Sequence, residues 1–82
     1  MNSVYILKCA DGTLYTGSTL DVKKREHEHN ELKSGAKYTR ARRPVKLVYS
    51  ERCKNYAKAR EREAEIKRME RNEKLQLIKD QK

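Results

Sequence analysis

The sequence predicts an α+β fold, because three short strand patterns occur beside longer segments with helical spacing. The strand patterns, rich in β-branched and aromatic residues or alternating in polarity, occupy residues 3–8, 13–18 and 45–50. Helical spacing covers residues 21–33, the short segment 36–42, and the chain from residue 56 onward, with a restart near residue 72. The 82 residues have room for a single domain, 1–82, in which we expect residues 79–82 to fray.

The composition predicts a thin protein with a small core. Hydrophobic residues make up 35% of the chain and charged residues 40%, and without Trp or Phe the interior depends on Val, Ile, Leu and Tyr. No apolar run could span a membrane, and the N-terminus lacks the apolar core of a signal peptide, so we expect a cytoplasmic protein with no membrane partner. In that compartment Cys9 and Cys53 are expected to be free thiols, with a structural disulfide as the alternative.

Positive charge is concentrated in the middle of the sequence. The chain has a formal net charge of +9, and residues 34–54 supply +6 of it, because Glu51 is their single acidic residue. The basic residues of this segment are Lys37, Arg40, Arg42, Arg43, Lys46, Arg52 and Lys54. Such charge attracts a polyanion through steering and counterion release, so we predict a nucleic-acid partner. A merely soluble basic protein and a binder of acidic membrane surfaces are the alternatives.

The length of the first turn decides whether Tyr5 and Tyr15 share a face of the sheet. A loop of only Asp11 and Gly12 would place the two tyrosines on opposite faces. A three-residue loop that begins at Ala10, with Gly12 in the left-handed conformation of a bulge, would place them on one face. We predict the three-residue loop, whose register pairs Leu7 with Tyr15 and Tyr5 with Gly17.

The first helix is predicted to begin at a cap on Thr19 or Asp21 and to run to about Lys33, before Ser34 and Gly35. Four residues of this helix fall on one stripe, at i, i+3, i+7 and i+10, and two of them are polar. The stripe consists of Val22, Arg25, His29 and Leu32.

The helix that follows Asn55 repeats this spacing. Its stripe consists of Tyr56, Ala59, Glu63 and Ile66. Burying an isolated carboxylate is costly, so Glu63 needs a basic partner, a metal ion or a place at the rim. The last helix is expected to be capped by Asn72 and to pack on the sheet through Leu75 and Ile78.

Every polar residue on these faces also has a purely structural explanation, and His27, on another face of its helix, is most simply a surface residue. Tyr5 and Tyr15 could be packing aromatics of the strands, and His29 could be a core histidine. Arg25 and Glu63 could be solvated charges on the helix surfaces. These residues nevertheless fall on faces that are predicted to be buried, and together they suit the hydrolysis of a phosphodiester.

The chemistry of that set is specific. A phenol could accept a proton from water, a guanidinium could hold two phosphate oxygens, and a carboxylate could anchor a divalent metal ion. The pKa of a free phenol is about 10, so a tyrosine base requires nearby cations or a metal ion to lower it. Arg25 or the basic segment could supply that field.

In these residues the sequence resembles the GIY-YIG nuclease superfamily. The two name-giving triplets correspond to Ser3-Val4-Tyr5 and Tyr15-Thr16-Gly17. The helix arginine corresponds to Arg25, and the metal-binding glutamate to Glu63. The segment from Gly35 to Pro44 is similar to that of small, stand-alone, single-domain bacterial members. The ordered set covers nearly the whole chain.

The resemblance implies a three-stranded antiparallel sheet flanked by helices and one shallow site. In the family a tyrosine acts as general base on water, and which tyrosine does so differs among members. The arginine stabilises the transition state, and a single Mg²⁺ or Mn²⁺ on the glutamate assists the leaving group. Glu63 is then the expected metal ligand, and His29, where relatives carry tyrosine or histidine, could relay a proton. The expected catalytic residues are Tyr5, Tyr15, Arg25, His29 and Glu63.

The sequence also departs from the family pattern. Ser3 and Thr16 replace a glycine and an isoleucine, which are mild changes. Ser18 stands where repair-type relatives carry a lysine, which removes one candidate for lowering the pKa of a phenol. Asn72 is only a loose counterpart of the late asparagine of those relatives. We expect no separate DNA-targeting domain, and therefore weak affinity and specificity, with a protein partner as one possible source of targeting.

The predicted function is a metal-dependent endonuclease that acts on DNA and recognises branched or damaged structure rather than sequence. The alternative is a nucleic-acid-binding module, for DNA or RNA, with weak or no catalysis. We expect a monomer or weak dimer. The residues predicted to contact nucleic acid are Lys37, Arg40, Arg42, Arg43 and Lys46.

Overall fold

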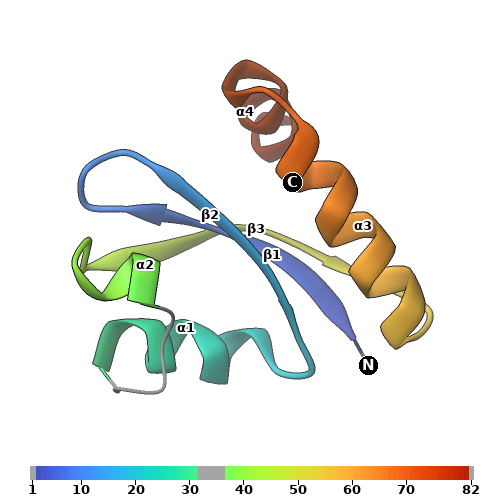
Figure 1. Cartoon of the computed structure of the whole chain (residues 1–82), viewed down its shortest axis with the longest axis horizontal. Helices are drawn as coiled ribbons and strands as arrows, with labels where there is room; N and C mark the ends of the chain where they lie inside the picture. The colour runs from blue at the N-terminus through green and yellow to red at the C-terminus, as the bar shows by residue number, and fades with distance from the viewer. Residues whose placement is uncertain (1, 32–36, 82) are drawn as a thin grey trace.

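A three-stranded antiparallel sheet with the strand order β2-β1-β3 forms the centre of the fold (Figure 1). The computed structural model describes residues 2–31 and 37–81. The strands are β1 (Ser3–Cys9), β2 (Leu14–Thr19) and β3 (Val45–Arg52). The helices are α1 (Val22–Glu31), the one-turn α2 (Lys37–Arg40), α3 (Tyr56–Arg68) and α4 (Arg71–Asp80). The predicted α+β fold is confirmed, and the predicted end of the first helix at Lys33, with Leu32, Ser34 and Gly35, lies outside the described residues.

The β1–β2 turn has the predicted three-residue loop. The amide of Cys9 donates to the carbonyl of Thr13 over 2.8 Å, and the amide of Gly12 donates to the carbonyl of Cys9 over 2.9 Å. Gly12 has φ 87°, in the left-handed region that glycine adopts without steric cost. The register pairs Leu7 with Tyr15 and Tyr5 with Gly17. Both tyrosines therefore lie on one face of the sheet, as predicted.

Strand β1 is the middle strand, and helices cover both of its faces. In Figure 1, α1 and α2 lie on one side of the strands and α3 and α4 on the other. The cluster on the α3 side contains Val4, Ile6, Tyr49, Cys53, Ala59 and Ile66. The cluster on the α1 side contains Tyr5, Leu7, Cys9 and Val45. Alternate residues of β1 thus enter two separate small cores, because successive side chains of a strand point to opposite faces.

Side-chain caps position the two helices that carry the candidate residues. The Oδ1 of Asp21 accepts a hydrogen bond from the amide of Lys24 at 3.1 Å, and the Thr19 hydroxyl accepts from the amide of Asp21 at 3.2 Å. Of the two predicted caps, Asp21 is thus the residue that caps α1. The side chain of Asn55 accepts from the amide of Lys58 at 2.9 Å and caps α3. Both caps satisfy backbone donors that a helix leaves free at its start.

The start of α4 differs from the prediction. The prediction that Asn72 caps this helix is wrong, because Glu70 is the N-cap and Asn72 lies inside the helix. Glu70 and Glu73 form a reciprocal capping box, in which the amide of Glu70 donates to Glu73 Oε1 at 3.0 Å. Because α4 begins at Arg71, two residues before a helix capped by Asn72 would begin, the free amides at its start are satisfied by Glu70 and Glu73.

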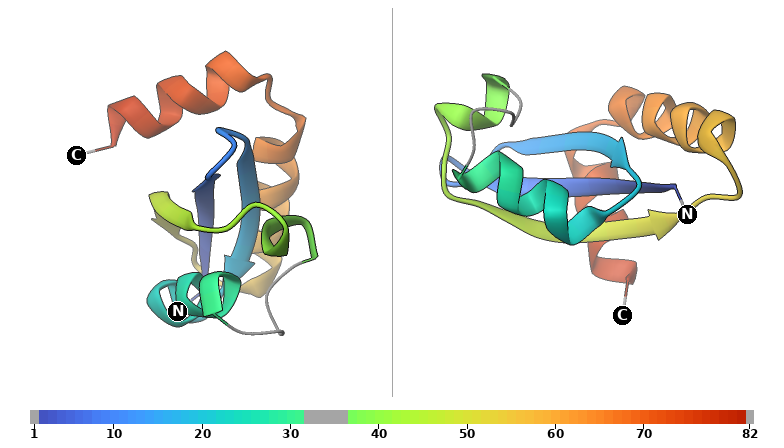
Figure 2. Two further views of the ribbon diagram at one scale, coloured as in Figure 1. Left: turned by 90° about the vertical axis from the view of Figure 1, so that its left-hand side faces the viewer. Right: turned by 90° about the horizontal axis from the view of Figure 1, so that it is seen from below.

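The packing face of α4 is also rotated from the predicted one. Leu75 is 41% exposed, whereas Leu77 and Ile78 pack against the core. Figure 2 shows α4 turning sharply away from the direction of α3. Helix α4 continues to Asp80, and the Gln81 side-chain amide donates to the Ser50 carbonyl of β3. Lys82 lies outside the described residues, and the fraying of residues 79–82 stays a prediction.

The two cysteines are free and buried, so the structural disulfide is excluded. Cys9 pairs with Val45 at one end of β3, and Cys53 follows Arg52 at the other end. Burial raises the pKa of both thiols, which lowers their reactivity. Among the described residues, no helix is both long and apolar enough to cross a membrane.

Candidate active site

Tyr5 lies at the centre of the α1 side of the sheet, with its hydroxyl over the backbone of Gly17. The Tyr5 side chain is 2% exposed. A Cβ added to Gly17 would lie 2.5 Å from the Tyr5 hydroxyl oxygen and 2.8 Å from its ring carbon Cζ. Any side chain at Gly17 would therefore collide with the phenol. Because β2 is an edge strand, this glycine lets the Tyr5 hydroxyl reach the edge of the sheet.

A buried hydrogen-bond chain continues from Tyr5 into α1 and α2. The Tyr5 hydroxyl lies 3.0 Å from Nε2 of His29, and Nδ1 of His29 lies 2.7 Å from the Thr39 hydroxyl. His29 and Thr39 are both 0% exposed. This hydrogen-bond chain links β1 to α1 and α2, which lie on the same side of the sheet (Figure 1).

Burial keeps both titratable members of this chain neutral. The pKa of Tyr5 is raised to about 12, because the effect of burial outweighs the opposite effect of the nearby Arg25 guanidinium. Burial, together with the positive charges of Arg25 and Arg43, lowers the pKa of His29 to about 4. A neutral imidazole has one donor and one acceptor nitrogen. The hydrogen bonds can therefore run from Tyr5 through His29 to Thr39 or in the opposite direction. The two arrangements differ in which ring nitrogen of His29 carries the proton.

Arg25 and Tyr15 complete the α1 side of the site. Nη1 of Arg25 donates to Oε1 of Glu28 at 2.9 Å, and the Arg25 side chain keeps 28% of its surface exposed. The hydrogen bond to Glu28, and after it contact with the Tyr5 phenol, raise the pKa of the Arg25 guanidinium. The Tyr15 ring centroid lies 6.4 Å from that of Tyr5 and 5.1 Å from that of His29. Arg25 is thus held beside the phenols while part of it remains accessible.

Glu63 lies on the other side of the β2 edge, on α3. The Ser18 hydroxyl donates to Glu63 Oε1 at 2.8 Å, and Lys67 Nζ lies 2.7 Å from Glu63 Oε2. Partial burial alone would raise the pKa of Glu63, but the hydrogen bonds from Lys67 and Ser18 outweigh it and lower the pKa. Glu63 is thus an ionised, 16% exposed carboxylate. Of the three alternatives predicted for this carboxylate, a basic partner, a metal ion or a place at the rim, the structure shows the basic partner, Lys67.

The five predicted catalytic residues gather around the Tyr5 phenol. The charges of Tyr15, Arg25 and Glu63 all act on the pKa of Tyr5, and His29 is its hydrogen-bond partner. Tyr5 points across Gly17 toward the edge strand, whose residue Ser18 contacts Glu63 on the opposite side. The site therefore straddles the β2 edge, with proton-handling groups on one side and a carboxylate on the other.

A single carboxylate suits a metal ion that needs few protein ligands. Within residues 2–31 and 37–81, no group of three or more His, Cys, Asp or Glu side chains could hold a metal ion. Mg²⁺ needs no such cage, because it keeps several water ligands and binds one or two carboxylates together with substrate phosphates. Both Glu63 oxygens carry a hydrogen bond, yet each has a further lone pair. The donor set fits a weakly held hard cation that shares its ligands with the substrate.

The residues predicted to contact nucleic acid have different surroundings. Arg42 pairs with Asp11 of the hairpin turn, with Nε 3.1 Å from Oδ2. Arg43 Nε donates to the carbonyl of His29, over the C-terminal end of α1. Arg40 and Lys46 are exposed, and the side chain of Lys37 lies outside the described part of the chain. Arg42 and Arg43 therefore have structural contacts that sequence patterns do not reveal, and their contact with nucleic acid stays a prediction.

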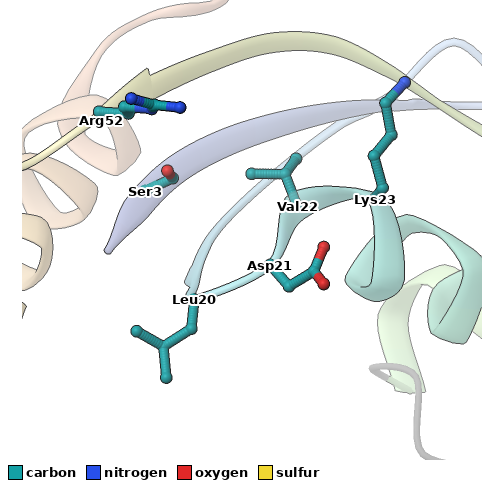
Figure 3. Close-up of a pocket in the computed structure, with 6 residues that line it drawn as sticks. All are labelled: Ser3, Leu20, Asp21, Val22, Lys23 and Arg52. Carbon is teal, nitrogen blue, oxygen red and sulfur yellow. The ribbon is translucent and has the colours of Figure 1, made fainter. Parts of the chain in front are cut away.

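A separate open hollow lies at the Ser3 end of the sheet (Figure 3). It lies between Arg52 of β3 and the segment that connects β2 to α1, whose Leu20 extends away from the sheet. The six residues that line it include none of the predicted catalytic residues. The candidate site is therefore not this hollow but the shallow edge of β2.

Sequence reasoning missed three residues that hold the site together. Lys67 lies four residues after Glu63, a spacing that favours a helical ion pair and could have indicated the contact. In the sequence Ser18 marks only the absence of a lysine, whereas in the structure its hydroxyl donates to Glu63. Thr39 carried no signal, because its contact with His29 depends on the docking of α2.

Comparison with known proteins identifies the family. Residues 1–76 match the family described as the GIY-YIG catalytic domain. A UPF0213 protein of Syntrophus aciditrophicus is 59% identical over 78 residues, covering 95% of this chain and 90% of the relative, and one of Clostridium perfringens is 58% identical, covering 95% and 83%. The solution NMR structure of a UPF0213 protein from Bacillus halodurans has a TM-score of 0.63 at 43% identity, covering 99% of this chain and 86% of that chain. The chain therefore belongs to the GIY-YIG nuclease family, among relatives that are small UPF0213 proteins.

Proposed function

We propose that this protein is a metal-dependent endonuclease that hydrolyses phosphodiester bonds in DNA and selects its substrate by structure. One observation carries the proposal: the Tyr5 hydroxyl contacts His29 Nε2 and lies within electrostatic reach of Arg25, Tyr15 and Glu63. A phenol, a guanidinium and a carboxylate around one point suit phosphodiester hydrolysis, because they can transfer a proton, stabilise charge and hold a metal ion.

In this proposal Tyr5 takes the proton from the attacking water. A phenol with a pKa near 12 is already protonated at neutral pH, so it accepts a proton only if it passes its own proton on. Nε2 of neutral His29 is the acceptor, at 3.0 Å. A phosphodiester bound beside the site brings negative charge that favours the resulting imidazolium. Tyr5 and His29 thus act as a relay, a role that neither group has alone.

Arg25 binds the phosphate in the same proposal. Its guanidinium already lies beside the Tyr5 phenol and is partly exposed, and it exchanges the carboxylate of Glu28 for phosphate oxygens. Planar guanidinium groups match two phosphate oxygens at once, which favours the developing charge of the transition state. A single Mg²⁺ or Mn²⁺ held by Glu63 would supply positive charge at the leaving oxygen.

The test is a cleavage panel of nicked, branched and plain duplexes with Mg²⁺ or Mn²⁺. Tyr5→Phe, Arg25→Ala and Glu63→Gln are each expected to lower the rate by about 100-fold or more, the usual size of losing a general base or charge-stabilising group. His27→Gln, an exposed change on the same helix as Arg25, is the matched control and should leave the rate unchanged. Equal cleavage by all four variants would assign the activity to a contaminant.

A nucleic-acid-binding module without catalysis is the second candidate. The ion pair between Glu63 and Lys67 favours it, because an ammonium 2.7 Å from Oε2 competes with a metal ion. This function requires tight binding of DNA or RNA without cleavage, and an affinity that Glu63→Gln leaves unchanged. Cleavage that disappears in Glu63→Gln contradicts it.

A further inference from the structure

The charges of α3 are divided between its two flanks. On the flank toward β3, acidic and basic side chains neutralise one another: Arg62 pairs with Glu51 at 3.0 Å and with Glu65 at 3.4 Å, and Lys58 pairs with Glu61 at 3.6 Å. On the flank toward β2, positions four, seven and eleven residues after Tyr56 hold Arg60, Glu63 and Lys67. Within α3, all of whose residues are described, Glu63 is the single acid on that flank. The β2 flank therefore favours an anionic partner.

Tyr56 is the large aromatic residue at the beginning of this flank. It is 61% exposed, although its sequence spacing with Ala59 and Ile66 predicts a place on the buried stripe. That prediction fails because Tyr56 is the first residue of α3, and Ala59, almost one turn further on, is the first to be buried. The Tyr56 ring is therefore accessible to a partner from solvent.

Arg60 is held against this tyrosine. Its Cζ lies 5.7 Å from the centroid of the Tyr56 ring, and its Nη1 donates to the Tyr56 hydroxyl at 2.8 Å. The charge of Arg60 also acts on Glu63, one turn along the helix. A ring and a guanidinium are thus presented together, next to the carboxylate of the candidate active site.

We propose that Tyr56 and Arg60 form a subsite for an unpaired nucleotide of the DNA substrate, with the base stacked on Tyr56 and the adjoining phosphate on Arg60. This inference rests on the proposed nuclease function and narrows its substrate class. An aromatic ring on an open surface stacks on bases that are not already stacked in a duplex, and a guanidinium beside it tracks the backbone. The preferred substrates therefore carry unpaired nucleotides near the cut.

The spacing along α3 sets where that nucleotide lies. Tyr56 and Glu63 are seven residues apart, which corresponds to about 10.5 Å along a helix axis. Stacked nucleotides advance about 3.4 Å each, so the base on Tyr56 is about three nucleotides from the phosphate beside Glu63. An abasic site at that position should weaken binding more than abasic sites on the other side of the cut.

Tryptophan fluorescence provides a direct test, because the chain contains no Trp. Tyr56→Trp places a single indole at the proposed subsite, and Leu75→Trp places one on α4, where the native side chain is 41% exposed. A single-stranded 12-nucleotide oligodeoxyadenylate and a blunt duplex of the same length are titrated in EDTA. The expected result is strong quenching of Tyr56→Trp by the single strand, weak quenching by the duplex, and none for Leu75→Trp.

Affinity measurements separate the roles of ring and charge. Stacking of one base contributes about 1–3 kcal/mol, so Tyr56→Ala should weaken single-strand binding by about 5- to 150-fold, whereas Tyr56→Phe should bind nearly as well as the native protein. Arg60→Gln should reduce the salt slope by about 0.7, the value for one phosphate contact on a single strand. All of these changes are exposed, and circular dichroism checks that each variant is folded.

The outcomes distinguish this inference from the function on which it rests. Binding of the oligonucleotides, seen by anisotropy, without quenching of Tyr56→Trp overturns the subsite and leaves the nuclease proposal standing. Equal affinity of Tyr56→Ala and Tyr56→Phe for the single strand also overturns it. Absence of single-strand binding overturns the subsite, whereas the nuclease proposal is overturned only by the cleavage panel with Mg²⁺ or Mn²⁺. Quenching without cleavage in that panel supports the subsite within the second candidate function.

Discussion

The two sides of the β2 edge hold functional groups in opposite environments. On the α1 side Tyr5 and His29 are almost completely buried, and burial moves both pKa values toward the neutral forms, to about 12 and about 4. On the α3 side Glu63 is ionised and forms an ion pair with Lys67, whose side chain is 54% exposed. The sheet thus separates a buried, neutral hydrogen-bond chain on one face from a partly exposed ion pair on the other.

This difference matches what each side has to do. A proton relay needs groups held at fixed distances, which burial and complete hydrogen bonding provide. A carboxylate that exchanges a lysine for a metal ion, and a surface that admits a polymer, need solvent access instead. Four changes test how far the two environments differ, and they are described in order of decreasing effect.

The largest expected effect is the pH dependence of stability that arises from His29. Its folded pKa, about 4, lies below the unfolded value, so the unfolded chain binds a proton first as the pH falls. Stability is therefore complete above about pH 6.5 and is lost as the pH falls toward the folded pKa, by about 2–3 kcal/mol between pH 7 and 4.5. Urea unfolding at several pH values measures this. His27→Gln, the exposed control, should show the same loss, and a flat profile would contradict the buried neutral histidine.

Gly17→Ala tests the contact between Tyr5 and the edge strand. The added methyl group would lie 2.5 Å from the Tyr5 hydroxyl in a buried site, so the phenol must move. Overpacking of this kind costs about 1–3 kcal/mol. The change should also lengthen the hydrogen bond to His29 and lower cleavage. Ser18→Ala, the adjacent residue on the other side, should cost about 1 kcal/mol or less, and an equal loss in both variants would contradict a specific role for Gly17.

Thr39→Val tests whether Thr39 positions His29. The isosteric change leaves Nδ1 of the buried imidazole without its 2.7 Å partner, which costs about 1–3 kcal/mol. We also expect the pH profile of cleavage to shift, because Thr39 then no longer selects the direction of the proton chain. Thr39→Ser keeps the hydroxyl and should restore the profile. Loss of stability with an unchanged profile would limit Thr39 to a structural role.

Lys67→Gln should have the smallest effect on stability and a clear effect on metal binding. Exposed ion pairs contribute about 0–1 kcal/mol, so the free energy of unfolding should hardly change. Without the ammonium, Glu63 has one fewer competitor, and Mn²⁺ titrated by electron paramagnetic resonance should bind more tightly. Lys74→Gln, on α4, is the matched loss of charge and should leave Mn²⁺ affinity unchanged. Equal affinities in all three proteins would contradict Glu63 as the metal ligand.

Local sequence signals were sufficient for much of the fold. Asp11 and Gly12 with the flanking alternation indicated the hairpin and its bulge, and the paired tyrosines followed from that register. The failures have local causes. Tyr56 and Leu75 are exposed because helical spacing identifies a stripe but not where the helix meets the sheet. Asn72 is not the cap because α4 begins earlier, at Arg71, where Glu70 and Glu73 form the capping box.

The sequence by itself determined which residue types are available for the chemistry: a glycine at position 17, phenols on one face of a hairpin, and an arginine and a histidine four residues apart on a helix. These depend on spacing within single elements, where geometry repeats every two or 3.6 residues. Only the tertiary structure decided that Tyr5 meets His29 and Thr39, and that Glu63 is held by Ser18 and Lys67. Burial, and with it the pKa of each group, depends on how α1, α2 and α3 dock on the sheet, and no local pattern encodes that packing.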